Sequence, residues 1–130
     1  MNILLRIAAA YSLAWAVALA VPAWLSFGSG TPTAEITSLA HGLAIANLGL
    51  AYAFYRAAQN PPAHRAVLYS ALLIFGLRGV IGTYEVLYVL EGTPAMIRLV
   101  DFVLSLALFV GMLNALPQTL QASEADTGRG

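Results

Sequence analysis

Four long apolar runs constrain this chain more than any other feature of its sequence. A helix needs about 20 mostly apolar residues to cross the hydrocarbon core of a bilayer. The four runs cover residues 3–27, 36–57, 66–90 and 95–116, and turns rich in glycine and proline separate them. We therefore predict an all-α integral membrane protein, a four-helix bundle with up-down-up-down topology, in which residues 1–117 form a single transmembrane domain.

The composition supports this class and excludes several functions. Of the 130 residues, 60% are hydrophobic and only 9% are charged, whereas about a quarter of an ordinary soluble domain is charged. The formal net charge is zero, so no basic surface for nucleic acid is expected. The absence of cysteine excludes disulfides, thiolate metal sites and cysteine nucleophiles. The sequence also contains no zinc motif, phosphate loop or nucleophile elbow, so we predict no metal, no cofactor and no catalytic residue.

The positions of the arginines predict the orientation of the helices. Arg6 lies near the amino end of the first run, and Arg56 and Arg65 flank the loop after the second run, so all three fall on one side. Short loops rich in arginine stay in the cytoplasm. We therefore predict that both termini are cytoplasmic, that the membrane is the bacterial inner membrane, and that the polar residues 118–130 form a disordered tail.

The first run has an alternative interpretation as a cleavable signal peptide. Residues 18–20, Ala-Leu-Ala, resemble the small-residue site at which signal peptides are cut. The apolar run continues to residue 27, however, which makes it long enough to span a membrane. We therefore interpret it as the first transmembrane helix.

Ionisable side chains within the apolar runs define the candidate site. Charges at membrane depth are costly and usually face a protein interior, so they are functional candidates by default. With a rise of about 1.5 Å per residue, Glu85, Asp101 and His41 are each expected about 8–9 Å below the outer end of their helices. Arg78 is expected near the midplane, seven residues before Glu85 on the same helix face. We predict an outer-half pocket with Arg78 as its floor, Glu85 and Asp101 on its rim and His41 in its wall. Arg78 is expected to extend along its helix and pair with Glu85.

Other polar residues complete this predicted pocket. Tyr84 and Tyr88 are candidates for its wall, and Asn47 and Ser105 for secondary positions. Arg98 is a further secondary candidate, either as the neighbour of Asp101 or as a side chain that extends to the outer interface. The alternative is that these charges only join helices. Because interhelical polar contacts contribute only about 0.6 kcal/mol on average, such a role offsets little of the insertion cost.

Three glycines recur at every third residue beside Arg78, at Gly76, Gly79 and Gly82. Small residues allow neighbouring helices to approach closely, so we expect helix packing at these positions. The second interpretation is that they open space for a ligand.

Several short motifs resemble a known group of proteins. They are His41-Gly42-Leu43, Leu48-Gly49-Leu50, the loop at Arg65, Arg78-Gly79, Glu91-Gly92-Thr93-Pro94 and the acid Asp101. In these motifs the chain resembles the small bacterial four-helix membrane proteins of the DoxX-like group. The resemblance implies the four-helix fold and a membrane location, and it supplies no reaction.

These features together predict an accessory protein rather than an enzyme. We expect its outer-half pocket to bind a lipid, isoprenoid, quinone or small anionic ligand. No cofactor is predicted, but a lipid or quinone could remain bound to the protein. One alternative is a proton-coupled carrier that acts as an oligomer and uses Glu85 or Asp101 to carry the proton. The other is a structural subunit of a larger membrane complex. The expected partners are membrane lipids and either further copies of the chain or that complex.

Overall fold

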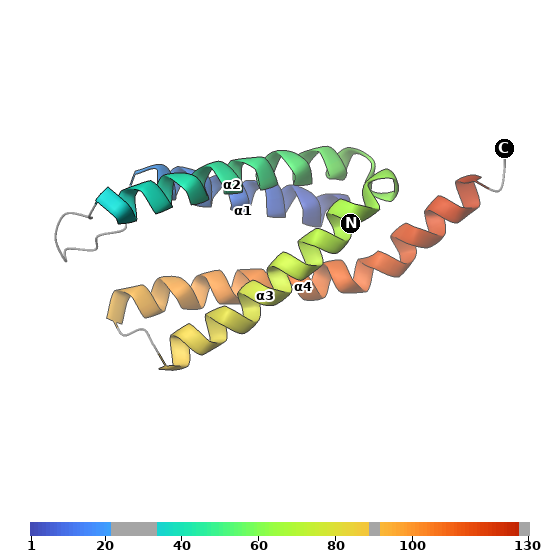
Figure 1. Cartoon of the computed structure of the whole chain (residues 1–130). Helices are drawn as coiled ribbons and strands as arrows, with labels where there is room; N and C mark the ends of the chain where they lie inside the picture. The colour runs from blue at the N-terminus through green and yellow to red at the C-terminus, as the bar shows by residue number, and fades with distance from the viewer. Residues whose placement is uncertain (22–33, 89–91, 128–130) are drawn as a thin grey trace.

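The computed structural model describes residues 1–21, 34–88 and 92–127, and nearly all of them are helical. The long helices are α1 (Asn2–Ala20), α2 (Ala34–Gln59), α3 (Arg65–Tyr88) and α4 (Gly92–Thr127), and a 3-10 helix, η2 (Pro61–His64), joins α2 to α3 (Figure 1). All four long helices are apolar and long enough to cross a membrane. Large apolar side chains such as Ile3, Leu39, Leu73 and Val80 are exposed on their outer faces. The chain is therefore an all-α, multi-pass membrane protein, as the sequence predicts.

The boundary between α2 and α3 follows from two consecutive prolines. A residue that precedes proline disfavours the helical conformation, and Asn60 has an extended backbone with φ −146° and ψ 78°. Pro61 then opens η2 at a position where its missing N–H costs nothing. The Ala63 N–H donates to the Asn60 carbonyl at 3.2 Å and closes the turn. The chain therefore reverses within a few residues.

The helix boundaries differ from the prediction most at the ends of α1 and α4. Helix α1 ends at Ala20, and residues 22–27 of the predicted first helix lie outside the described residues. At the other end, α4 continues through Pro117 to Thr127 (Figure 1). The prediction of a disordered tail is therefore wrong for residues 118–127, and residues 128–130 lie outside the described part of the chain.

The continuation of α4 has a local cause. Pro117 removes one backbone hydrogen bond, but the following residues Gln118, Leu120 and Gln121 are good helix formers. The Thr119 hydroxyl also donates to the Ala115 carbonyl at 2.9 Å, which bridges the proline turn. One lost bond is therefore not enough to end the helix.

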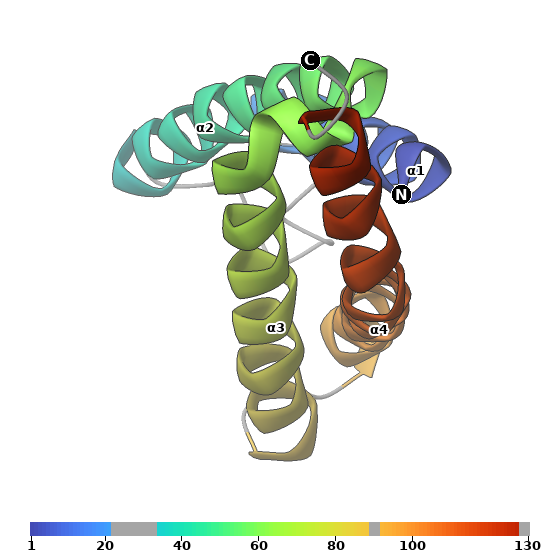
Figure 2. The ribbon, with the colours of Figure 1, turned by 90° about the vertical axis from the view of Figure 1, so that its right-hand side faces the viewer.

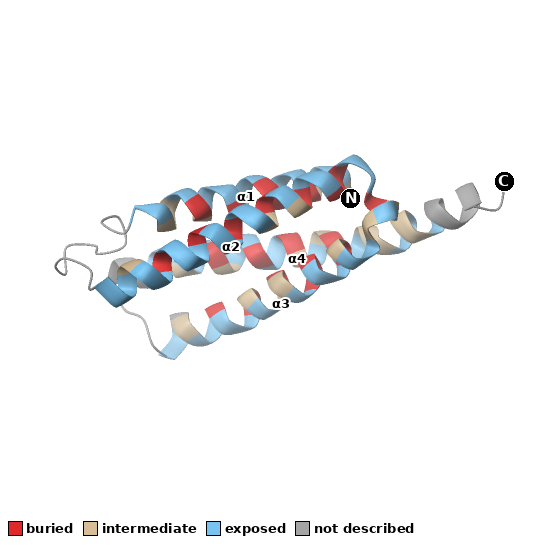
Figure 3. Ribbon diagram, turned by 45° about the horizontal axis from the view of Figure 1, so that its top comes forward, coloured by how far each residue is buried: buried red, intermediate tan, exposed pale blue. Residues whose placement is uncertain are grey.

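Helix α1 packs along α2, and α3 packs along α4, so the bundle consists of two helix pairs (Figure 2). The buried positions of each helix recur alternately every three and four residues, which is the spacing of knobs-into-holes packing. On α1 and α2 most of these positions are alanine, which lets the two helices approach closely. They are Leu5, Ala9, Ser12 and Ala16 on α1, and Ala40, Ala44, Asn47, Ala51, Phe54 and Ala58 on α2. Figure 3 shows that buried residues follow the inward faces of the helices.

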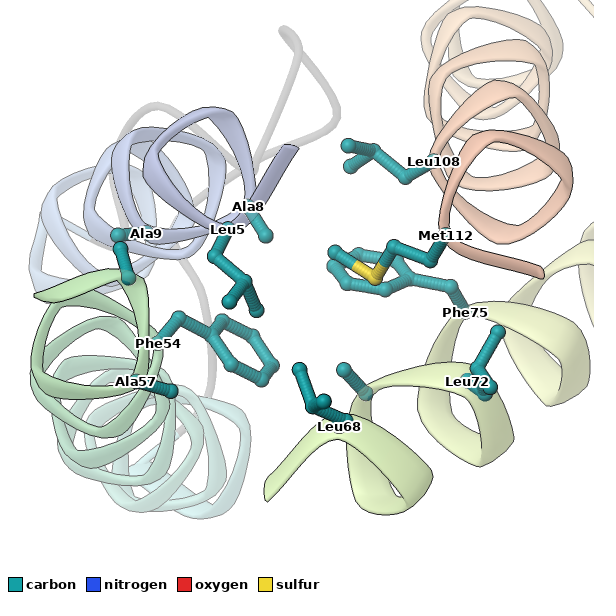
Figure 4. Packing of buried hydrophobic residues seen from close by; sticks show 12 residues of the cluster. Leu5, Ala8, Ala9, Phe54, Ala57, Leu68, Leu72, Phe75, Leu108 and Met112 are labelled. Atoms are coloured by element: carbon teal, nitrogen blue, oxygen red, sulfur yellow. The ribbon is translucent and has the colours of Figure 1, made fainter. Parts of the chain in front are cut away.

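Within the described residues, the fully buried large apolar side chains gather in the half of the bundle near η2. There Leu5, Phe54, Leu68, Phe75 and Met112 meet from all four helices (Figure 4), and the rings of Phe54 and Phe75 lie 5.8 Å apart. In the other half, the buried residues outside this cluster are small or polar. They are Ser12, Ala16, Ala40, Ala44, Asn47, Ala51, Gly79, Gly82, Asp101 and Ser105. The half with the small and polar lining is the one that holds the candidate site.

Candidate functional site

Arg98 on α4 is the centre of an ion-pair cluster. Its Nε donates to Oε2 of Glu85 on α3, and its Nη1 donates to Oδ2 of Asp101 at 2.5 Å. The side chains of Arg98 and Glu85 are 24% and 32% exposed, whereas that of Asp101 is fully buried. The predicted contact between Arg98 and Asp101 is therefore confirmed. Arg98 does not merely extend to an interface, because it joins α3 to α4.

Helix α1 completes the coordination of Asp101. The indole N–H of Trp15 donates to Oδ1 of Asp101 at 3.1 Å, so both carboxylate oxygens have a donor. One turn further along, the hydroxyls of Tyr11 and Ser105 lie 3.4 Å apart. Tyr11 and Trp15 are four residues apart and therefore project from the same face of α1. The polar cluster thus belongs to α1, α3 and α4.

Arg78 does not pair with Glu85, contrary to the prediction from their spacing. Its guanidinium carbon lies over the ring of Tyr11, 5.4 Å from the centroid, and 6.0 Å from the ring centroid of Trp15. Glu85 is instead bound by Arg98 from the facing helix. Within the described residues, no oxygen accepts a hydrogen bond from the half-buried Arg78 guanidinium, so only the two aromatic rings stabilise this cation.

The three glycines on α3 do not share one role. A Cβ at Gly76 would lie 3.2 Å from the Phe109 ring, and one at Gly82 would lie 3.3 Å from Phe102. At these two positions the predicted close packing against α4 is confirmed. Gly79 is buried as well, yet a Cβ there would meet nothing within 4 Å. The second interpretation of the glycines, open space beside Arg78, therefore applies to Gly79.

The facing residues on α4 explain why the space at Gly79 is open. Gly76 meets Phe109 and Gly82 meets Phe102, so Gly79 is level with the residues midway between the two phenylalanines. The buried residue there is Ser105, whose side chain is small. A glycine thus faces a serine between two large rings.

Three predicted site residues lie away from the cluster. His41 is exposed on α2, because Ala40 is buried in the bundle and the next helical residue is rotated by about 100°. Tyr84 and Tyr88 are 60% and 75% exposed, and their rings contact each other at 5.5 Å. The aromatic residues that contact the cluster are instead Tyr11 and Trp15.

Asn47, a secondary candidate, is buried on α2 but has no contact with the ion pairs. Its Nδ2 donates to the Leu43 carbonyl of its own helix at 2.8 Å. Its Oδ1 is buried and has no hydrogen-bond partner within the described part of the chain. Asn47 therefore leaves one acceptor unsatisfied in the half of the bundle that has small side chains.

Sequence reasoning missed Tyr11 and Trp15, although a signal was present. Tyr11 and Trp15 each carry a polar group on an aromatic ring, and they are four residues apart in a mostly apolar helix. A buried acid on another helix requires donors, and an unpaired arginine favours aromatic faces. This spacing and these two requirements together could have indicated that α1 contributes side chains to the site.

Most polar groups of the cluster already have partners within it. No group of three or more histidines and acids in the described residues could hold a metal ion. The oxygens of Asp101 and one oxygen of Glu85 already accept hydrogen bonds. Within the described residues, Arg78 is the charged side chain of this region whose contacts are two aromatic rings and not a group of opposite charge.

Comparisons with known proteins identify no relative. No protein-family model matches the chain, and neither a curated protein nor a solved structure is significantly similar to it.

Proposed function

We propose that this protein is an accessory membrane protein that binds the anionic head group of a small ligand at Arg78. The observation that carries this proposal is the distribution of charge in the cluster. Both acids, Glu85 and Asp101, are bound by Arg98, which leaves Arg78 as a cation without an acid partner. A charge at this depth is costly unless it is paired, and a bound anion would supply the pair.

The geometry of the guanidinium suits such a ligand. Its five N–H donors lie in the plane of the group, and its carbon lies 5.4 Å from the ring centroid of Tyr11 and 6.0 Å from that of Trp15. Because no oxygen of the described residues accepts a hydrogen bond from these donors, they are available to a ligand. Carboxylate and phosphate oxygens match two parallel N–H donors of arginine, so these are the head groups we favour.

The surrounding bundle also favours binding in this half. The buried residues near Arg78 include Ser12, Gly79 and Ser105, which are small, whereas the opposite half is filled by large side chains. Ligand sites typically combine a mostly apolar lining with a few placed polar groups. A quinone would fit the apolar lining, but it carries no charge to balance Arg78.

We place the bundle in the bacterial inner membrane with both termini in the cytoplasm. Arg6, Arg56 and Arg65 support this orientation through their positions near one end of the bundle. The proximity of Leu4 to Gly111 and of Trp15 to Asp101 supports an antiparallel arrangement of α1 and α4, which the proposed up-down-up-down topology requires.

The carrier alternative receives less support from the geometry. A proton carrier needs an acid that exchanges its proton during the cycle, whereas both oxygens of Asp101 and one oxygen of Glu85 accept hydrogen bonds from Trp15 and Arg98. A role as a structural subunit would leave Arg78 to meet a partner, but its guanidinium contacts α1 of its own chain.

Native mass spectrometry of the gently purified protein tests the proposal. We expect wild-type protein to retain an anionic ligand and Arg78→Gln to lose it. Arg56→Gln is the matched control, because Arg56 is exposed on α2 and should not affect retention. Equal retention by the wild type and Arg78→Gln would contradict the proposal.

A further inference from the structure

We infer that the anion bound at Arg78 is the head group of a chain-bearing membrane amphiphile, which reaches the site from the lipid and lies against Gly79. This inference rests on the proposed function and specifies the class of ligand. The shared chemistry is an anionic phosphate or carboxylate group. The question is whether it arrives as part of a lipid or as a free ion.

The depth of Arg78 favours a lipid source. Its backbone lies ten residues before the end of α3 at Tyr88, a distance of about 15 Å along the helix axis. The outward side chains at this depth are large and apolar on α3 and α4 alike; they are Leu77, Val80, Ile81, Val103 and Leu104. A free ion that approached from the side would lose its hydration against this surface. A head group carried by a hydrocarbon chain is already dissolved in the membrane.

The charges of the cluster oppose a free anion from the water above. Glu85 and Asp101 stand between Arg78 and the nearer end of α3 and α4, and Arg98 is their only described arginine partner. Two acids and one arginine carry a formal net charge of −1, which repels an anion that descends along the bundle axis. The lateral route beside α3 avoids this negative charge.

Gly79 marks the point at which a ligand can approach the helix. The position is buried but offers open space to a Cβ, whereas Phe109 and Phe102 occupy the space at Gly76 and Gly82. Glycine permits close approach of another molecule to the backbone. Gly79 is level with Arg78 and is rotated from it by about 100° around the helix, so a chain attached to a head group on the arginine would reach this space by turning around α3. The two phenylalanines would bound it on either side.

Trp15 provides the readout for a direct test. The chain contains two tryptophans, Trp15 and Trp24, so Trp24→Phe leaves one indole, whose ring centroid is 6.0 Å from the Arg78 guanidinium carbon. Fluorescence of the full-length protein in dodecyl maltoside is titrated with dodecyl phosphate, inorganic phosphate and dodecanol. We expect saturable binding of dodecyl phosphate, and binding of inorganic phosphate and of dodecanol weaker by about tenfold or more.

Two glycine variants locate the chain of the amphiphile. Gly79→Leu fills the open space and should weaken binding of dodecyl phosphate by about tenfold. Gly49→Leu is the matched control, because Gly49 is exposed and its Cβ would also meet nothing. Gly79→Ala, which adds a single methyl group, provides a milder variant should the leucine prevent folding. Thermal unfolding of each variant reports on folding separately.

The outcomes separate this inference from the proposed function. Equal affinity for inorganic phosphate and dodecyl phosphate, lost in Arg78→Gln, would overturn the lipid source but keep the anion site. An affinity for dodecanol equal to that for dodecyl phosphate would also overturn the inference. So would unchanged binding of dodecyl phosphate by a folded Gly79→Leu variant. If no anion binds in a manner that depends on Arg78, the proposed function itself fails.

Discussion

The indole N–H of Trp15 donates to Oδ1 of Asp101 at 3.1 Å, and this bond ties the first helix to the last. Because Arg98 holds the other carboxylate oxygen, Asp101 organises donors from two helices. Trp15 in turn contacts Arg78 through its ring. The buried acid therefore helps to fix the position of the unpaired cation without touching it.

The first prediction concerns the stability that Asp101 provides. We expect Asp101→Leu to lower the free energy of unfolding by about 2–4 kcal/mol, because Trp15 and Arg98 each lose an acceptor. Asp101→Asn keeps an oxygen for Trp15 and should cost less. Unfolding in mixed micelles measures both values, and Trp15→Phe isolates the indole bond. Wild-type stability in Asp101→Leu would show that these contacts are not formed.

The second prediction separates the two arginines by double-mutant cycles. Glu85→Gln and Arg98→Gln should show a coupling energy of about 0.5–2 kcal/mol, because their side chains are in contact. Glu85→Gln and Arg78→Gln should add within about 0.5 kcal/mol, because the structure gives them no contact. Coupling of Glu85 to Arg78, with additive effects of Glu85 and Arg98, would instead support the pairing of Arg78 with Glu85 that their sequence spacing suggests.

The third prediction compares residues within and outside the cluster. His41→Ala should leave ligand retention unchanged, because His41 is exposed on α2. Trp15→Leu should weaken binding by about 0.5–2 kcal/mol, because the arginine loses an aromatic face. Titration with dodecyl phosphate, followed by native mass spectrometry, measures both variants. If His41→Ala lost the ligand and Trp15→Leu retained it, the binding site would lie at His41 on α2.

The fourth prediction tests the packing of α1 against α2. Ala9 is buried and belongs to the positions of α1 that pack along α2, so Ala9→Leu should reduce the free energy of unfolding by about 1–3 kcal/mol through overpacking. Ala10 lies on the same helix but is exposed, and Ala10→Leu should have little effect. Thermal unfolding of the two variants provides the measurement. Similar stability of both would argue against close alanine contacts between the helices.

The sequence allowed the four spanning helices to be predicted, because their signals are local. Apolar length and proline or glycine breaks act over neighbouring residues, and η2 follows directly from Asn60 and two prolines. The prediction was wrong at residues 118–127, where composition suggested a disordered tail. There the helix propensity of the residues after Pro117 and the Thr119 hydroxyl bond preserve the helix.

The candidate site was predicted only in part. The contact between Arg98 and Asp101 spans three residues on one helix, so helical periodicity was enough to predict it. The depth estimates placed His41 level with the acids, but depth along a helix does not define the direction in which a side chain points. The burial of Ala40 and Ala44 turns His41 outward.

By itself, the sequence determined that this chain forms four membrane-length helices with a few charges inside them. Hydrophobicity, helical period and turn chemistry are properties of adjacent residues and need no tertiary contact. Only the tertiary structure decided which charges meet. Arg98 reaches Glu85 from α4, and Arg78 turns to Tyr11 and Trp15 on α1, because the relative rotation and register of three helices fix these partners. The unpaired cation at the centre of the proposed site is therefore a property of the fold.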